Sequence, residues 1–190
     1  MSLWDSLLGR SKPKAANLDA LFAVPQAALT LEAGAGFKPT GVGAVCYRQN
    51  EGGAFSTMQT DIQELLDADG GPAVERTSDS FGFTWLVCRH DSFDISGLVN
   101  ELHAVNATLE GQGFGPSLLC SYVGFNGPDG KPLGLVYLYK RGSFYPFAPA
   151  GDQRRDNALE LQVRGLIGDD VPLEKDLDRW LAIWGAPGLT

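Results

Sequence analysis

The chain has 190 residues, of which 44% are hydrophobic and 20% charged, and its formal net charge is −8. This length suits one domain that buries a sizeable core without disulfides or metal ions. The negative charge argues against nucleic acid as a partner, because affinity for phosphates comes largely from lysine and arginine. No apolar run reaches the roughly 20 residues of a membrane-spanning helix, and the first residues do not resemble a signal peptide. We therefore expect a cytoplasmic protein.

The first fourteen residues differ in pattern from the rest of the chain. An apolar stripe at helical spacing is followed directly by basic residues: Leu3, Trp4, Leu7, Leu8, Arg10, Lys12 and Lys14. Such a stripe is typical of segments that lie on an anionic membrane surface, here the inner face of the membrane. A terminal helix docked on its own domain, or a frayed tail, is the simpler explanation of the pattern. We divide the chain into this segment, residues 1–14, and one domain, residues 15–190.

The first part of the domain predicts helices, a strand and a hairpin. Proline near the start and glycine near the end indicate a helix over residues 25–36, and a short strand follows at 42–48. Apolar residues recur at helical spacing over 55–68, which predicts an amphipathic helix. A weak strand at 73–77 turns into a strong one at 81–89, so these two form an antiparallel hairpin.

A long helix and a second hairpin follow. Residues 95–109 carry the helical apolar pattern, with capping side chains before it and glycines after it. Two apolar runs, 118–125 and 133–139, flank a turn rich in Gly, Asn and Asp, which predicts a hairpin. Both faces of the 133–139 strand are apolar, so we place it inside the sheet. The proline of residues 144–147 favours an edge strand.

The last part of the chain predicts two further helices. Residues 154–167 direct Leu159, Val163, Leu166 and Ile167 inward and Arg154, Arg155, Glu160 and Arg164 outward. Leu177, Trp180, Leu181 and Trp184 form a final apolar stripe, which either clasps the parent domain or mediates self-association. Strands that arrive as hairpins between helices predict an α+β fold, an antiparallel sheet covered by helices.

Residues capable of chemistry are few and do not form a known motif. Cys46, Cys88 and Cys120 fall in three different strands, which favours buried free thiols over a metal or nucleophile site. His90 follows a strand end, where a general base is conceivable, and His103 lies on the long helix. We expect no metal, no cofactor and no enzymatic activity.

Two side-chain groups are candidate binding sites. A pocket formed by Arg89, His90, Tyr139, Lys140 and Arg141 would make the protein an enzyme or a small-molecule binder. Lys140, Arg141, Arg154 and Arg155 would bind an acidic partner if they converged near the exit of the second hairpin. Solvated surface charge is the simpler interpretation of these four residues.

The chain resembles an actinobacterial family, the PspA-associated protein PspAB. The resemblance extends over nearly the whole chain and is carried by WDSLLGRSKPK (4–14), NLDALFAVPQAALTL (17–31), GVGAVCYR (41–48), SFGFTWLVCRHD (80–91), ELHAVNATLEGQGFGPSLLCS (101–121), LGLVYLYKRGSFYPFAP (133–149), RRDNALELQVRGLIG (154–168) and RWLAIWGAPGL (179–189). The family is connected by name and gene neighbourhood with the phage shock protein A envelope-stress response.

The resemblance implies a setting, because it brings no catalytic residues. It implies an accessory protein that binds a phage shock protein A-like partner, at the membrane surface if residues 3–14 contact lipid. The order of elements also resembles type III secretion chaperones and their YbjN-like relatives. The oligomeric state is left open by the sequence.

Overall fold

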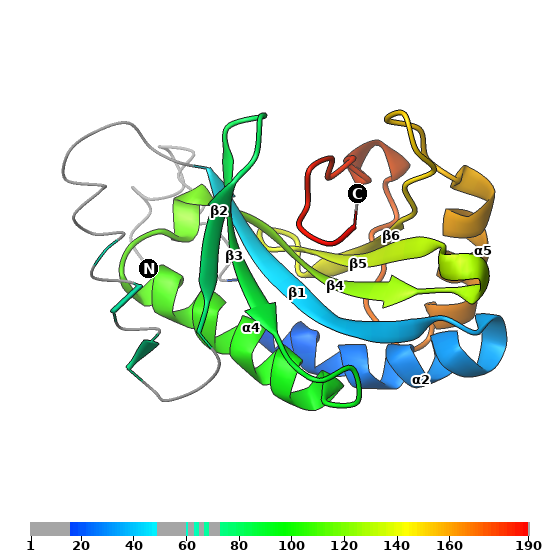
Figure 1. Cartoon of the computed structure of the whole chain (residues 1–190), viewed down its shortest axis with the longest axis horizontal. Helices are drawn as coiled ribbons and strands as arrows, with labels where there is room; N and C mark the ends of the chain where they lie inside the picture. The colour runs from blue at the N-terminus through cyan, green and yellow to red at the C-terminus, as the bar shows by residue number, and fades with distance from the viewer. Residues whose placement is uncertain (1–15, 49–59, 61–62, 65–66, 69–72, 190) are drawn as a thin grey trace, which may run out of the picture.

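The computed structural model describes residues 16–48, 60, 63–64, 67–68 and 73–189. In this part of the chain the strands form one six-stranded antiparallel sheet in the order β2-β3-β1-β4-β5-β6 (Figure 1). The strands are β1 Lys38–Arg48, β2 Glu75–Ser78, β3 Phe83–Arg89, β4 Leu118–Asn126, β5 Pro132–Leu138 and β6 Ser143–Phe147. Both predicted hairpins are confirmed, as is the position of β5 inside the sheet and of β6 at its edge.

Helices cover one face of the sheet (Figure 1). They are the 3-10 helix η1 Leu18–Ala23 and the α-helices α2 Val24–Ala35, α4 Ile95–Gly111 and α5 Asn157–Ile167. Asp94 caps α4 by accepting a hydrogen bond of 2.9 Å from the Gly97 amide, and Asp156 caps α5 by accepting one of 3.0 Å from Leu159. These caps satisfy amides that have no partner within the helix.

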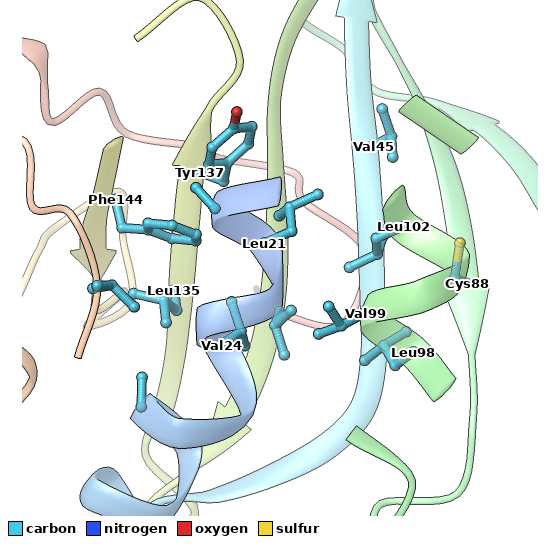
Figure 2. Close-up of a cluster of buried hydrophobic side chains, with 14 of the residues drawn as sticks. Leu21, Val24, Val45, Cys88, Leu98, Val99, Leu102, Leu135, Tyr137 and Phe144 are labelled. Atoms are coloured by element: carbon cyan, nitrogen blue, oxygen red, sulfur yellow. The ribbon is translucent and has the colours of Figure 1, made fainter. Parts of the chain in front are cut away.

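The main core lies between these helices and the sheet. Figure 2 shows Leu21 and Val24 together with Leu98, Val99 and Leu102 of α4, in one cluster with Val45, Leu135 and Tyr137 of the strands. The alternation along β5 is as predicted, because Leu133, Leu135, Tyr137 and Tyr139 face the helices and Val136 and Leu138 face the other side. Period-two alternation therefore gives the sheet two apolar faces.

The second apolar face is covered by the C-terminal end of the chain. We call residues 174–189 the strap; Trp180, Ile183, Ala186 and Leu189 are its buried apolar residues. The prediction of a helix over residues 177–184 is wrong, since the strap contains only the 3-10 helix η4 Leu177–Arg179. The physical reason is that side chains from outside the strap bind the carbonyl groups of Trp180, Leu181 and Pro187.

The helix near residue 154 also differs from its prediction. It begins at Asn157, so Arg154 and Arg155 precede it, and Glu160 is buried although its position predicted exposure. Of the helix predicted over 55–68, the described residues Thr60, Gln63, Glu64 and Asp67 are helical. Ala68 lies in a turn, and the other residues of that predicted helix and the segment 1–14 lie outside the described residues.

Candidate functional site

A mostly apolar cavity of about 230 Å³ lies between the strap and the sheet, and we call it the strap pocket. Its floor includes Cys46, Trp85, Cys120 and Tyr145, all of which are buried. Its rim includes Phe81, Leu181 and Trp184. The pocket lies at the end of the sheet where β1 ends and β4 begins, because Tyr47 of β1 pairs with Leu118 of β4.

The hollow arises from the sizes of the side chains in one cross-strand row. Trp85 pairs with Cys46, Cys46 with Cys120, and Cys120 with Leu138, so these four residues follow one another across four strands. Directly paired residues on antiparallel strands place their side chains on the same face. Two small thiols therefore lie side by side between a tryptophan and a leucine, and the space above them is not filled.

The polar atoms on the pocket floor are held in their neutral forms. The contact with the Cys120 thiol, together with burial, raises the pKa of Cys46. Burial also raises the pKa of Tyr145, whose hydroxyl donates a hydrogen bond of 2.8 Å to the Leu181 carbonyl. A pocket with neutral, internally bonded polar groups favours apolar ligand groups over charged ones.

Apolar side chains at the rim are open to solvent. Phe81 is 51% exposed and Leu181 is 62% exposed. Trp184 is half-buried and packs edge-on against Phe147, with ring centroids 5.0 Å apart. A second hollow of about 790 Å³ shares Phe81 and Trp184 and extends along the turns at 129–132 and 149–153. The two hollows together form a longer depression with aromatic side chains at its middle.

A buried ion pair fixes the strap near the pocket. Arg155 donates from Nε to Glu160 Oε1 at 2.8 Å, and the same carboxylate oxygen accepts from the Ala148 amide at 2.9 Å. The guanidinium also donates to the Trp180 carbonyl and lies over the Phe147 ring, 5.2 Å from its centroid. Arg155 therefore joins α5, β6 and the strap.

A second carboxylate anchors the beginning of the strap. Glu174 accepts hydrogen bonds from Arg141 Nε at 3.0 Å and from Ser143 Oγ at 2.9 Å, and its carbonyl accepts one of 3.1 Å from Trp180 Nε1. Burial alone would raise the pKa of Glu174, but the hydrogen bonds from Arg141, the Asp176 amide and Ser143 outweigh it and lower this pKa to about 2. The carboxylate is charged at neutral pH.

The pocket predicted around Arg89, His90 and Tyr139 is not formed. Arg89 pairs with Val42 near the start of β1. The Tyr139 amide donates a hydrogen bond to the carbonyl of Leu119, whose neighbour Leu118 pairs with Tyr47 near the end of β1. About five strand residues, roughly 16 Å, separate these two positions along β1. The five residues of that prediction therefore lie at opposite ends of the sheet.

His90 has two carboxylate neighbours of its own. Its Nδ1 lies 3.1 Å from Asp94 and its Nε2 lies 2.8 Å from Glu101. His103 contacts Asp19 at 3.3 Å and stacks on Phe22. Both histidines thus join neighbouring elements, and among the described residues no group of three or more His, Cys, Asp and Glu side chains is placed to hold a metal ion.

The four basic residues of the second candidate site have separate partners. Lys140 donates to the Pro116 carbonyl at 2.9 Å and Arg141 binds Glu174, whereas Arg154 lies 3.7 Å from Asp152 and Arg155 binds Glu160. Arg141 and Arg155 lie by opposite ends of β6. Both predicted tryptophans, Trp180 and Trp184, belong to the strap.

The strap pocket was not predicted from the sequence. The cysteines were correctly predicted to be buried and free, but the pairing of Cys46 with Cys120 depends on the register of β1 and β4. Phe81 was assigned to a strand and Leu181 to a helix, which gave no reason to bring them together. The signal available in the sequence was an aromatic residue, Phe81, directly after the Ser-Asp-Ser turn at residues 78–80.

The sequence of this chain matches a known protein family. Residues 1–188 match the family PspAB, described as PspA associated protein B. No curated protein and no solved structure matches the chain, and the likeness to type III secretion chaperones is not confirmed. None of the helices in the described ranges has the length and apolarity needed to cross a membrane. The match covers nearly the whole sequence, and the chain therefore belongs to the PspAB family, PspA associated protein B.

Proposed function

We propose that this protein is a non-enzymatic accessory protein that binds phage shock protein A, and that the strap pocket receives an apolar side chain of that partner. The family description supplies the partner, since it names an association with PspA. The observation that carries the site is the exposure of Phe81 and Leu181, 51% and 62%, beside an apolar cavity. Solvent-exposed apolar side chains around a pocket are typical of surfaces that bind proteins.

The shape of the site favours an amphipathic helix of the partner. A cavity of about 230 Å³ accepts one large side chain, and the neighbouring hollow continues past Phe81 and Trp184. An amphipathic helix presents apolar side chains at positions i, i+3, i+4 and i+7, so one enters the pocket and the next lies along the depression. The anchor is an aliphatic or aromatic residue, because the buried floor of the pocket is apolar and its one charged lining residue, Arg48, is exposed.

The test is a binding titration between the purified full-length chain and purified phage shock protein A of the same organism. We expect Phe81→Ser and Leu181→Ser each to weaken binding about tenfold or more, which corresponds to about 1.4 kcal/mol of binding energy. The matched control is Phe93→Ser, because Phe93 is 98% exposed and lines a different hollow, between α2 and the start of α4. This control should bind like the unaltered chain.

Two results would contradict the proposal. If phage shock protein A does not bind the unaltered chain, the partner is wrong. If Phe93→Ser weakens binding and Phe81→Ser does not, the partner is right and the site is wrong. Circular dichroism of each variant shows whether the fold is kept, since all three replaced side chains are largely exposed.

The location that we propose is the cytoplasm, with peripheral contact to the inner face of the membrane through residues 3–14. The support is the sequence pattern of Trp4 and three leucines followed by basic residues. Co-sedimentation of the full-length chain with anionic and neutral vesicles, at low and moderate salt, tests it. Binding that requires anionic lipid supports the proposal, and no binding in any condition contradicts it. Self-association through the strap stays a prediction that light scattering of Trp184→Ser would test.

A further inference from the structure

The described chain begins beside the end of the sheet that holds the strap pocket. The carbonyl of Asn17 accepts a hydrogen bond of 2.8 Å from the Tyr137 hydroxyl. The side chain of Asn17 also lies close to the turn between β5 and β6, 3.2 Å from where a Cβ on Gly142 would stand. The next strand residue, Leu138, lines the strap pocket from the other face of the sheet. Asn17 and the strap pocket therefore lie on opposite faces of the sheet, on either side of the end of β5.

The preceding residues are long enough to go around this end. Ala16 packs against the main core, so the path begins at residue 15, and seven extended residues, 9–15, span up to about 25 Å. Packed layers lie about 10 Å from a sheet, so passing from the helical face to the strap face takes about 20 Å. Residues 3–8 can therefore reach the pocket of the same chain.

Charge favours a path along this side of the molecule. Residues 1–15 carry three basic side chains and one acidic one, in a chain whose net charge is −8. Asp19 follows Asn17 by two residues and its side chain is exposed, so one carboxylate lies near the entry point at Asn17. The basic side chains of Arg10, Lys12 and Lys14 would be attracted to this carboxylate.

The chemistry of the segment matches the pocket. The pocket is open, mostly apolar and bordered by Phe81 and Leu181; its floor offers neutral groups, and its one charged lining residue is the exposed Arg48. The segment offers Leu3, Trp4, Leu7 and Leu8, with its charges placed after the stripe. A tryptophan is the side chain with the largest apolar area available for such a cavity.

We propose that residues 3–8 of the same chain occupy the strap pocket, with Trp4 as the inserted side chain, and that a partner must displace them to bind there. The inference rests on the proposed function only for the identity of that partner. An internal occupant lowers the apparent affinity of the partner by the fraction of pockets that are free. The same stripe is then either in the pocket or available to a membrane surface.

The experiment measures thiol labelling at two positions of the full-length chain. Leu181→Cys places a thiol at the pocket rim, and Leu177→Cys places one on the same strap at a position that lines another hollow. Both leucines are exposed, 62% and 51%, so the structure without an occupant predicts similar rates. The native cysteines are buried, and peptide mass spectrometry after reaction with N-ethylmaleimide separates each site.

We expect the thiol from Leu181→Cys to react about tenfold more slowly than that from Leu177→Cys, equal to about 1.4 kcal/mol of protection. Adding Trp4→Ser should raise the labelling rate at position 181 to the rate at position 177. The rate at position 177 should stay within about twofold of its value in the chain with Trp4. The matched control Lys12→Ser removes a charge without touching the stripe, and should leave most of the protection in place.

Equal rates at 181 and 177 in the chain with Trp4 would overturn the inference. Protection that disappears on dilution would overturn it too, because the occupant would then be a second copy. The two proposals fail separately. Equal rates together with Phe81-dependent binding of phage shock protein A would reject only the internal contact. Protection at 181 without any binding of that protein would reject only the partner.

Discussion

Cys46 and Cys120 are direct cross-strand partners on β1 and β4, and their thiols lie on the sheet face that is covered by the strap. The pair occupies the middle of a row that begins with Trp85 and ends with Leu138. Two small side chains between two large ones leave a hollow that the strap does not fill. The register of two strands thus determines where the apolar pocket lies.

The native thiols should react slowly in the folded protein. The neighbouring Cys120 thiol and burial raise the pKa of Cys46, and burial next to Glu101 raises that of Cys88, so few thiolates exist at pH 8. We expect little alkylation of Cys46 and Cys88 at pH 8 in buffer and complete alkylation in guanidinium chloride, as measured by mass spectrometry. Rapid alkylation of Cys46 in buffer would show that the pocket floor is open to solvent.

Acid should weaken the anchor at the start of the strap. The pKa of Glu174 falls from its ordinary 4.5 to about 2 on folding, so its charge stabilises the fold above pH 4.5. This contribution is lost as the pH decreases from 4.5 toward 2, and solvent screening at the half-exposed Arg141 keeps it well below the free energy that the pKa shift alone would give. Denaturant titrations of the unaltered chain and Glu174→Gln across this range should converge at low pH. A constant difference between them would contradict this account.

Two glycine-to-alanine changes should have opposite effects on stability. Gly134 pairs with Gly124 below Leu189, and a Cβ on Gly134 would stand 2.7 Å from Leu189 Cδ1. Gly134→Ala therefore displaces the end of the strap and should lower the free energy of unfolding by about 1 kcal/mol. Gly165 lies in α5 with open space around it, so Gly165→Ala should raise that free energy by about 0.5–1 kcal/mol. Thermal unfolding measures both, and equal signs would refute the packing argument.

Removing one partner of the Arg155–Glu160 ion pair should destabilise the fold more than replacing both partners with apolar residues. Glu160→Ala leaves a guanidinium that is 19% exposed without its carboxylate and removes the acceptor of the Ala148 amide. We expect this variant to lose about 3 kcal/mol of unfolding free energy. The double variant Arg155→Met/Glu160→Leu should lose less than the sum of the single changes, because neither charge is left unpaired. A double-mutant cycle by chemical denaturation tests this, and strict additivity would show that the two side chains act independently.

Much of the fold followed from local patterns. Alternation along residues 133–139 predicted a strand with two apolar faces, and capping residues such as Asp94 predicted the start of α4. The family resemblance of the sequence was confirmed over residues 1–188. These features were accessible because periodicity, turn residues and caps depend on neighbours within one element.

The strap shows why the last part of the chain was predicted incorrectly. Trp180 and Leu181 belong to an apolar stripe with helical spacing, yet their carbonyls accept hydrogen bonds from Arg155 and Tyr145. Glu160 has the position of a solvated residue on its helix and is buried, because Arg155 and the Ala148 amide satisfy its charge. Local spacing does not contain these contacts between residues far apart in the sequence.

The sequence by itself determined the fold class, most strand and helix positions, the burial of the three cysteines and the family. Only the tertiary structure decided that Cys46 lies beside Cys120, that Phe81 and Leu181 border one pocket, and that Arg89 and Tyr139 are at opposite ends of the sheet. The reason is physical. Element type depends on the periodicity of neighbouring residues, whereas a site depends on strand register and on the path of a strap that forms no regular element.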